Sequence, residues 1–247
     1  MILLSACGGN DEATAPDDAS RSLYVLGDSW AELMHDQVQV ELDDRGFDGV
    51  ALRRFGAGGS TMSEWADADG ELMSAVTGTL IDDPTPEPVV LMTLGGNDLL
   101  NAGATPESVE RDFRDVVAAL TNARPDVVVV LGSYDILNPA IAREECDELF
   151  EVTLGVTDVA DITRIFREQW AALESSEAAA SAAVVTVDAY GTLQGSPGDP
   201  DVSSPSPTEF LLDCIHLNDD GEDVYLDEVF DQAITSALCR TEEATAC

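Results

Sequence analysis

The chain has 247 residues, and 45% of them are hydrophobic, which suits one α/β domain of ordinary size with a substantial core. Its 49 acidic residues outnumber 11 basic residues, all of them arginine, and the formal net charge is −38. Such a surface repels nucleic acid and anionic lipid headgroups, which argues against a nucleic-acid-binding protein, and it favours a protein that works in concentrated salt.

The first 22 residues are predicted to be a processing signal and an acidic linker. A short apolar run leads into Leu4-Ser5-Ala6-Cys7, which resembles a bacterial lipobox in which Cys7 carries the lipid. The run is short and has no basic segment before it, so we expect the true start to lie upstream; the alternative is a chance apolar start. Residues 11–22 are polar and contain proline, as in a flexible tether. We therefore expect an extracytoplasmic protein, either secreted or touching a membrane only through a lipid on Cys7.

Apolar runs and turn residues predict five strands that alternate with helices. The strands are expected at residues 23–26, 49–55, 89–94, 126–131 and 183–187. The helices are expected at residues 30–44, 61–80, 106–122, 141–152, 157–179 and 219–238, with a long loop at 191–209. This alternation predicts one domain over residues 23–247, built on a parallel sheet with helices on both faces. Ligands of such sheets bind beyond the carboxyl ends of the strands.

Two glycine-containing clusters follow the first two strands. Gly27-Asp28-Ser29-Trp30 would present the Ser29 hydroxyl at the edge of the sheet, although an Asp-Ser pair is also a common helix cap. In Gly56-Ala57-Gly58-Gly59-Ser60-Thr61, glycine would let a backbone N–H approach an oxyanion. Taken alone, the second cluster indicates only a flexible turn.

Two more clusters lie further along the chain. In Gly95-Gly96-Asn97-Asp98 the Asn97 amide can donate toward developing negative charge, although asparagine is also frequent in ordinary turns. In Asp213-Cys214-Ile215-His216 the aspartate lies three residues before the histidine. It can therefore reach Nδ1 and fix the tautomer of His216. The alternative for this pair is a surface aspartate that happens to lie near a histidine.

Together and in this order, the four clusters resemble the blocks of the SGNH (GDSL-like) hydrolase family, over residues 23–238. The resemblance implies a flavodoxin-like three-layer α/β/α fold with a parallel sheet of about five strands. It also implies a serine ester hydrolase of the esterase or lipase type, acting on acyl or acetyl esters through an acyl-serine intermediate. We expect a monomer that needs no cofactor or metal and takes a small-molecule, lipid or polysaccharide ester as substrate.

The resemblance also assigns the site residues. Ser29 would be the nucleophile, His216 its general base, and Asp213 the group that orients His216. The oxyanion hole would combine the backbone N–H groups of Ser29 and Gly59 with the Asn97 amide, and Gly58 is the alternative to Gly59.

Two further residues each have two alternative roles. Trp30 departs from the family pattern, which more often has a smaller aliphatic residue there, and it would either narrow the acyl pocket or only pack. His35 lies in the first predicted helix without a metal-ligand partner nearby in sequence, so we expect a structural or surface role for it.

Setting Cys7 aside leaves an even number of cysteines, which in an exported protein favours disulfides: Cys146, Cys214, Cys239 and Cys247. Four cysteines allow three pairings. Cys239 and Cys247 are close in sequence, so closing that loop costs little, and Cys146 would then pair with Cys214. This second pair would follow the fourth and fifth strands at one sheet edge and would clip the loop that carries Asp213 and His216.

Two other interpretations compete with an esterase. A non-catalytic SGNH-like domain would bind glycan or cell-envelope material, but it need not retain Ser29, Asn97 and His216, and all three are present. A flavodoxin-like cofactor binder would need a phosphate-cradling loop after the first strand. The loop at Gly27-Asp28-Ser29 is too short, and Asp28 would repel a phosphate.

Overall fold

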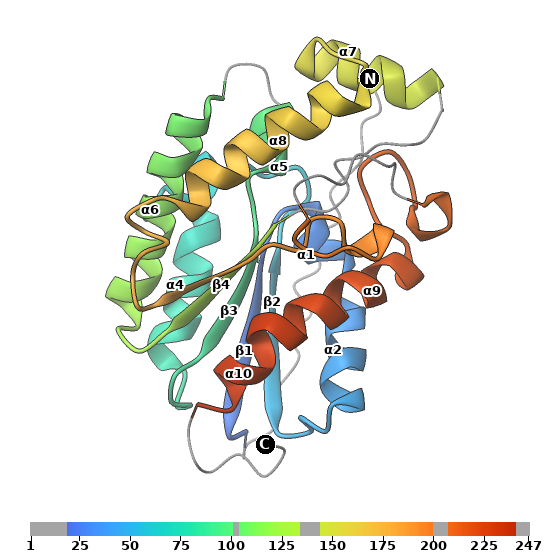
Figure 1. Ribbon diagram of the computed structural model, residues 1–247. Helices are drawn as coiled ribbons and strands as arrows, with labels where there is room; N and C mark the ends of the chain where they lie inside the picture. Colours follow the sequence, from blue (N-terminus) through green and yellow to red (C-terminus); the bar gives the residue numbers. More distant parts are fainter. Residues whose placement is uncertain (1–18, 101–103, 134–143, 200–206, 241–247) are drawn as a thin grey trace.

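The computed structural model describes residues 19–100, 104–133, 144–199 and 207–240. Five parallel strands form one sheet in the order β2-β1-β3-β4-β5 (Figure 1). They are β1 (Arg21–Gly27), β2 (Val50–Gly56), β3 (Val89–Thr93), β4 (Val128–Gly132) and β5 (Val184–Val187). This order confirms the predicted flavodoxin-like sheet, and its switch point lies between β1 and β3, where ligands of such sheets bind.

Helices cover both faces of the sheet. The bounds are α1 (Ser29–Leu33), α2 (His35–Asp44), α3 (Met62–Trp65), α4 (Glu71–Asp82), α5 (Gly96–Leu100), α6 (Pro106–Ala123), α7 (Glu144–Leu154), α8 (Val159–Glu174), α9 (Asp219–Val229) and α10 (Thr235–Leu238). A π-helical turn, Phe230–Ile234, joins α9 to α10. Figure 1 shows α2 and α9 on one side of the sheet and α4 and α6 on the other. Among the described residues no helix is both long and apolar enough to span a bilayer.

Two hydrophobic cores form because neighbouring residues of a strand point to opposite faces of the sheet. Leu23 and Val25 of β1 pack with α2 and α9, whereas Tyr24 and Leu26 pack with α4 and α6. Every residue of β1, β3 and β4 is buried. This burial explains the apolar runs at residues 23–26, 89–92 and 128–131, since a parallel sheet is covered on both faces.

The sheet begins two residues before the predicted start of the domain. Arg21 and Ser22 were expected in the linker, but both belong to β1. The buried Arg21 guanidinium donates to the Leu238 carbonyl (3.0 Å), and the Ser22 hydroxyl accepts from Thr85 (3.0 Å). These partners come from distant parts of the chain, so the local sequence does not reveal that polar side chains can be buried there. Cys7 lies outside the described residues, and its lipidation stays a prediction.

Several predicted helices differ in detail. The helix expected over 30–44 is divided at Met34 into α1 and α2, and the one expected over 61–80 is divided into α3 and α4 by a turn at 66–70. Helix α5 was not predicted at all. The loop expected at 191–209 contains short 3-10 turns at Thr192–Gln194 and Thr208–Phe210. Short glycine-containing segments carry too little periodicity to be identified as helices.

Candidate active site

Ser29 begins α1 immediately beyond the carboxyl end of β1. The buried Asp28 caps this helix, because its carboxylate accepts a hydrogen bond from the Trp30 backbone N–H (3.0 Å). The Asp28 N–H donates to the carbonyl of Thr93 on β3 (3.2 Å), which fixes the turn against the neighbouring strand. The turn therefore holds Ser29 at the switch point of the sheet, with its side chain partly exposed.

His216 reaches Ser29 from the opposite end of the chain. Its Nε2 lies 2.8 Å from the Ser29 Oγ, and its Nδ1 lies 2.8 Å from the Asp213 carboxylate. The three side chains thus form a continuous hydrogen-bonded series from hydroxyl to imidazole to carboxylate. Such a series can remove the serine proton during nucleophilic attack.

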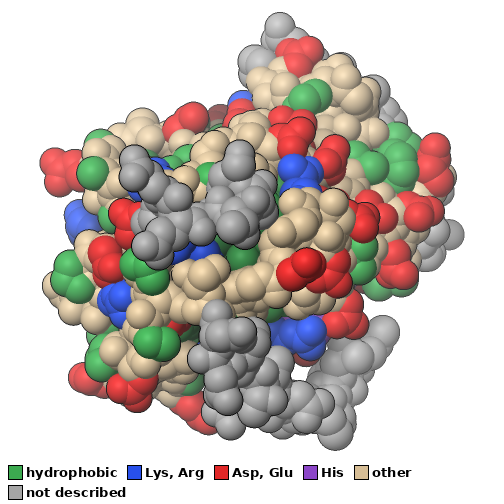
Figure 2. Space-filling view, turned by 90° about the horizontal axis from the view of Figure 1, so that it is seen from below, with side chains coloured by type: hydrophobic (Ala, Val, Ile, Leu, Met, Phe, Trp, Pro, Cys, Tyr) green, Lys and Arg blue, Asp and Glu red, His purple; other side chains and the backbone are tan. Residues whose placement is uncertain are grey.

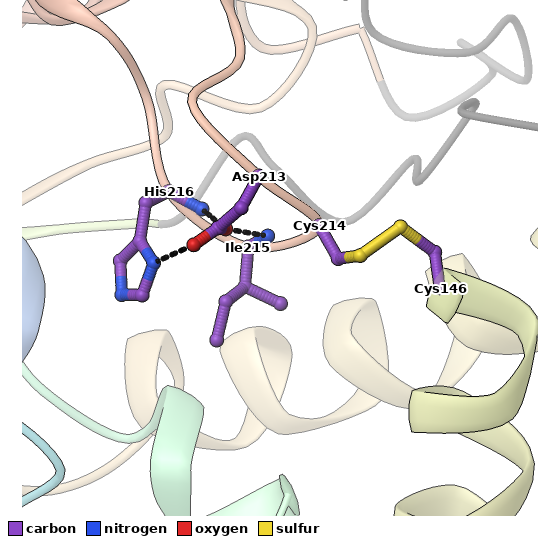
Figure 3. The surroundings of a disulfide bond; sticks show 5 residues. All are labelled: Cys146, Asp213, Cys214, Ile215 and His216. Carbon is purple, nitrogen blue, oxygen red and sulfur yellow. Dashed lines mark hydrogen bonds and ion pairs between the residues drawn. A yellow bond between two sulfur atoms is a disulfide. The ribbon is translucent and has the colours of Figure 1, made fainter. Parts of the chain in front are cut away.

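Asp213 also organises the loop that carries His216 (Figure 3). One carboxylate oxygen accepts hydrogen bonds from the backbone N–H groups of Ile215 (2.8 Å) and His216 (2.9 Å), while the other faces the imidazole. Burial alone would raise the pKa of Asp213. The hydrogen bonds from the His216 ring and from the loop N–H groups outweigh that effect and hold the pKa below its usual value. Asp213 is therefore a carboxylate at neutral pH, as the orienting group of a catalytic histidine must be.

Trp30 anchors the same loop from the other side. Its indole N–H donates to the Ile215 carbonyl (2.8 Å), and its ring meets Tyr225 of α9 edge-on, with centroids 5.2 Å apart. The side chain is only 4% exposed. Of the two roles considered for Trp30, packing is the one observed, with an added hydrogen bond to the loop before His216.

A disulfide joins the loop to α7 (Figure 3). Cys214 and Cys146 are bonded, with an S–S distance of 1.94 Å and a Cα–Cα distance of 5.5 Å. This is one of the two pairs that the sequence predicts. Cys214 lies directly between Asp213 and Ile215 in the sequence. Cys239 is also disulfide-bonded. Its predicted partner, Cys247, lies outside the described residues, so that pairing stays a prediction.

The predicted oxyanion donors lie on the segments that follow β1, β2 and β3. The Asn97 Nδ2 of α5 donates to the Ser60 carbonyl (2.9 Å), and this bond fixes the side chain with its amino group toward the Gly59 turn. An amide nitrogen carries two hydrogens, so one more can be donated to a ligand. Within the described ranges, the backbone N–H groups of Ser29 and Gly59 donate to no backbone carbonyl.

The turn that carries Gly59 has the backbone shape that glycine favours. The Ser60 N–H closes the turn by donating to the Ala57 carbonyl (3.0 Å), and Gly59 has a φ of +78°. Other residues rarely adopt this conformation. The choice of Gly59 over Gly58 as donor stays a prediction.

The comparisons with known proteins agree with this arrangement. The model of the GDSL-like Lipase/Acylhydrolase family matches residues 6–224, most of the chain. The chain belongs to this family. The resemblance predicted from the four sequence clusters is thereby confirmed, and the protein is a carboxylic ester hydrolase of the GDSL type. No curated protein matches the sequence.

Several solved structures share the fold of this GDSL-family hydrolase at low sequence identity. A carbohydrate esterase family 3 protein from Talaromyces cellulolyticus is 14% identical, with a TM-score of 0.60, over 90% of this chain and 100% of its own. LAE5, an alpha/beta hydrolase enzyme from the metagenome of Lake Arreo, is 18% identical, with a TM-score of 0.60, over 89% of this chain and 97% of its own. The acetyl xylan esterase AlAXEase is 17% identical, with a TM-score of 0.53, over 86% of this chain and 99% of its own. At such identities the likeness shows the fold alone.

Asp98 is a residue of the GDSL-family site that the sequence analysis did not single out. Its buried carboxylate accepts a hydrogen bond from the Met62 N–H (2.7 Å), and thus ties α5 to the start of α3. Burial raises the pKa of Asp98, and the nearby Asp112 carboxylate adds to the shift. Asp98 therefore links the two segments that carry Asn97 and Gly59. Its position directly after Asn97 was the only signal available.

His35, the other histidine of the chain, interacts with its neighbour in sequence. Its Nδ1 lies 3.1 Å from a carboxylate oxygen of the next residue, Asp36, at the start of α2. Among the described residues, no group of three or more histidine, cysteine, aspartate or glutamate side chains could hold a metal ion.

Proposed function

We propose that this GDSL-family enzyme hydrolyses small acyl or acetyl esters through an acyl-serine intermediate on Ser29. The observation that carries the proposal is the hydrogen-bonded series from Ser29 through His216 to Asp213, with both links at 2.8 Å. A binding domain without catalysis would not need this alignment of hydroxyl, imidazole and carboxylate.

The proposed reaction has two stages. His216 accepts the Ser29 proton as Oγ attacks the ester carbonyl, and the same proton passes to the departing alcohol. Water then attacks the acyl-serine, with His216 again as base, and the acid is released while Ser29 regains its proton. Asp213 keeps Nδ1 protonated, so that Nε2 is the nitrogen free to accept.

Two observations on structural neighbours guide the choice of substrates. One neighbour is a carbohydrate esterase and another is an acetyl xylan esterase. We therefore propose acetylated carbohydrate as the first natural substrate class to test, beside p-nitrophenyl esters of rising chain length. Turnover of at least one ester, with covalent labelling of Ser29 by a fluorophosphonate, is the expected result. Failure of both would contradict the proposal and favour the alternative, a glycan-binding domain.

Asn97→Ala is expected to lower kcat by roughly 10²–10³ with KM little changed, because it removes one of three oxyanion donors that act mainly in the transition state. The measurement is steady-state kinetics on the best ester of the panel. Asn122→Ala, at an exposed position of α6, is the matched control and should behave as the wild type. A rise in KM with unchanged kcat would instead place Asn97 in ground-state binding.

Repulsion between acidic side chains is also expected to make stability depend on salt. In Figure 2 acidic side chains are spread over the whole visible face and outnumber the basic ones. On α9, burial raises the pKa of Glu222 to about 7, and the charges of Asp219 and Asp223 add to the shift. These carboxylates therefore destabilise one another at neutral pH, and salt screens such repulsion.

We expect the melting temperature to rise between low and molar NaCl, as in a halophilic protein. Sucrose of equal osmolarity is the control, since it favours the folded state without screening charge. A flat or falling curve in NaCl would contradict the prediction.

A further inference from the structure

Helix α8 crosses the carboxyl edge of the sheet and contributes to both cores. Ile162 and Phe166, in its first half, pack in the core that contains α9. Trp170 and Leu173, in its second half, pack in the core that contains α6. In Figure 1 the helix passes close to α5 above the ends of the strands. The residues in the middle of α8 are therefore held over the strand ends where the site lies.

An ion pair fixes the register of α8 against β5. The Arg167 guanidinium lies 2.9 and 3.0 Å from the two carboxylate oxygens of Asp188, which directly follows β5. It also stacks over the Tyr190 ring, 4.6 Å from the centroid. Asp188 accepts a further hydrogen bond from the Tyr190 N–H (3.2 Å). The neighbouring turn of α8 consequently has little freedom to slide.

Gln169 lies two residues further along α8 and is 4% exposed. Its Nε2 donates a buried hydrogen bond of 2.7 Å to the carbonyl of Gly95. Gly95 joins β3 to α5 and has a φ of +109°, and a Cβ at this position would lie only 2.7 Å from the same Nε2. The positive φ favours glycine here, and a Cβ would displace the Gln169 amide.

This hydrogen bond fixes the segment that carries an oxyanion donor. Gly95 precedes Asn97 by two residues, and α5 begins between them at Gly96. We propose that Gln169 is a positioning residue that sets the placement of the Asn97 amide; the inference rests on the proposed ester hydrolysis. The segment is then held at two points: the Ser60 carbonyl accepts from the Asn97 side chain, and Gln169 donates to the backbone carbonyl of Gly95.

The amide of Gln169 suits this role for a chemical reason. A buried carbonyl that loses its donor pays the cost of desolvation, so the turn would relax to find another partner. A shift of the turn moves Asn97 relative to the developing oxyanion, and transition-state stabilisation falls steeply with such misplacement. Substrate binding in the ground state depends much less on this donor, so the effect should appear in kcat.

The test is a double-mutant cycle on an ester that the wild type hydrolyses. Gln169→Met keeps the length of the side chain and removes the donor. We expect kcat to fall about tenfold, which is less than the loss for removing the Asn97 donor itself, with KM within about twofold. In an Asn97→Ala background the same substitution should change kcat by less than about twofold, because the donor that it positions is gone.

Two controls separate positioning from loss of structure. Trp170→Phe alters the adjacent side chain, which together with Gln169 lines a small cavity between α8 and the ends of β3 and β4, and should leave kcat unchanged. Gln169→Leu should reproduce Gln169→Met, and melting temperatures of all variants are measured in parallel. A general structural defect would lower kcat by the same factor in both backgrounds, and that result would overturn the proposal, as would full activity of Gln169→Met. Absence of hydrolysis by the wild type would instead refute the proposed function.

Discussion

Ser29→Ala should lower kcat by about 10⁶, to or below the limit of detection, since loss of a nucleophilic serine removes nearly all rate enhancement by its triad. The fold should survive, because the lost hydroxyl makes one hydrogen bond, to His216, and one such bond contributes about 1 kcal/mol. For a domain of this size that corresponds to a change in melting temperature of roughly 2–4 °C.

A fluorophosphonate probe provides the direct readout of this prediction. It should label the wild type at Ser29 and leave Ser29→Ala unlabelled. Ser63→Ala, which alters an exposed serine of α3, is the matched control and should label as the wild type does. Labelling of another serine, or near-normal turnover by Ser29→Ala on every ester tested, would contradict the assignment of the nucleophile.

Asp213→Asn should be almost as severe, with a fall in kcat of about 10⁴. The carboxylate accepts from the His216 Nδ1, and an amide in its place would turn a donor toward that nitrogen. His216 would then adopt the opposite tautomer, with its proton on Nε2. Because Nε2 faces Ser29, the imidazole could no longer accept the hydroxyl proton. Asp220→Asn, on the exposed start of α9, removes the same charge nearby and should have little effect on kcat.

The stability of this variant has a definite pH dependence. The pKa of Asp213 in the folded protein lies below its usual value of 3.8. A lowered pKa means that the carboxylate stabilises the fold fully above about pH 4 and loses this contribution as the pH falls through the folded-state value. The melting temperature of Asp213→Asn should therefore lie below that of the wild type at neutral pH, and the gap should close in acid. A gap that is constant down to pH 2 would contradict this account.

Much of the fold could be predicted because its signals are local. The range 89–94 is apolar except for one threonine, and 126–131 contains four consecutive valines; the structure places β3 and β4 within two residues of those limits. Parallel pairing followed from the alternation of strands with helices. The division of the first helix was not predicted, since the break at Met34 occurs without a proline or glycine.

The site was predictable only in part for a related reason. Ser29, Asn97, Asp213 and His216 lie in short motifs that can be recognised one at a time. The groups that support them act over long sequence separations: Trp30 on Ile215 and Gln169 on Gly95. None of these partners has a motif of its own. A buried glutamine or tryptophan in an amphipathic helix reads as an ordinary packing residue until the structure shows what its polar atom touches.

The separation of 187 residues between Ser29 and His216 has a consequence for biosynthesis. Ser29 and the strands that present it leave the ribosome first. His216 follows only after β5, in the loop before α9. A nascent chain that has been made only as far as β5 contains Ser29 but not His216, whose Nε2 lies 2.8 Å from the Ser29 Oγ in the finished fold. Under the proposed mechanism, ester hydrolysis begins only after synthesis has passed His216 and its loop has met Ser29 at the start of α1.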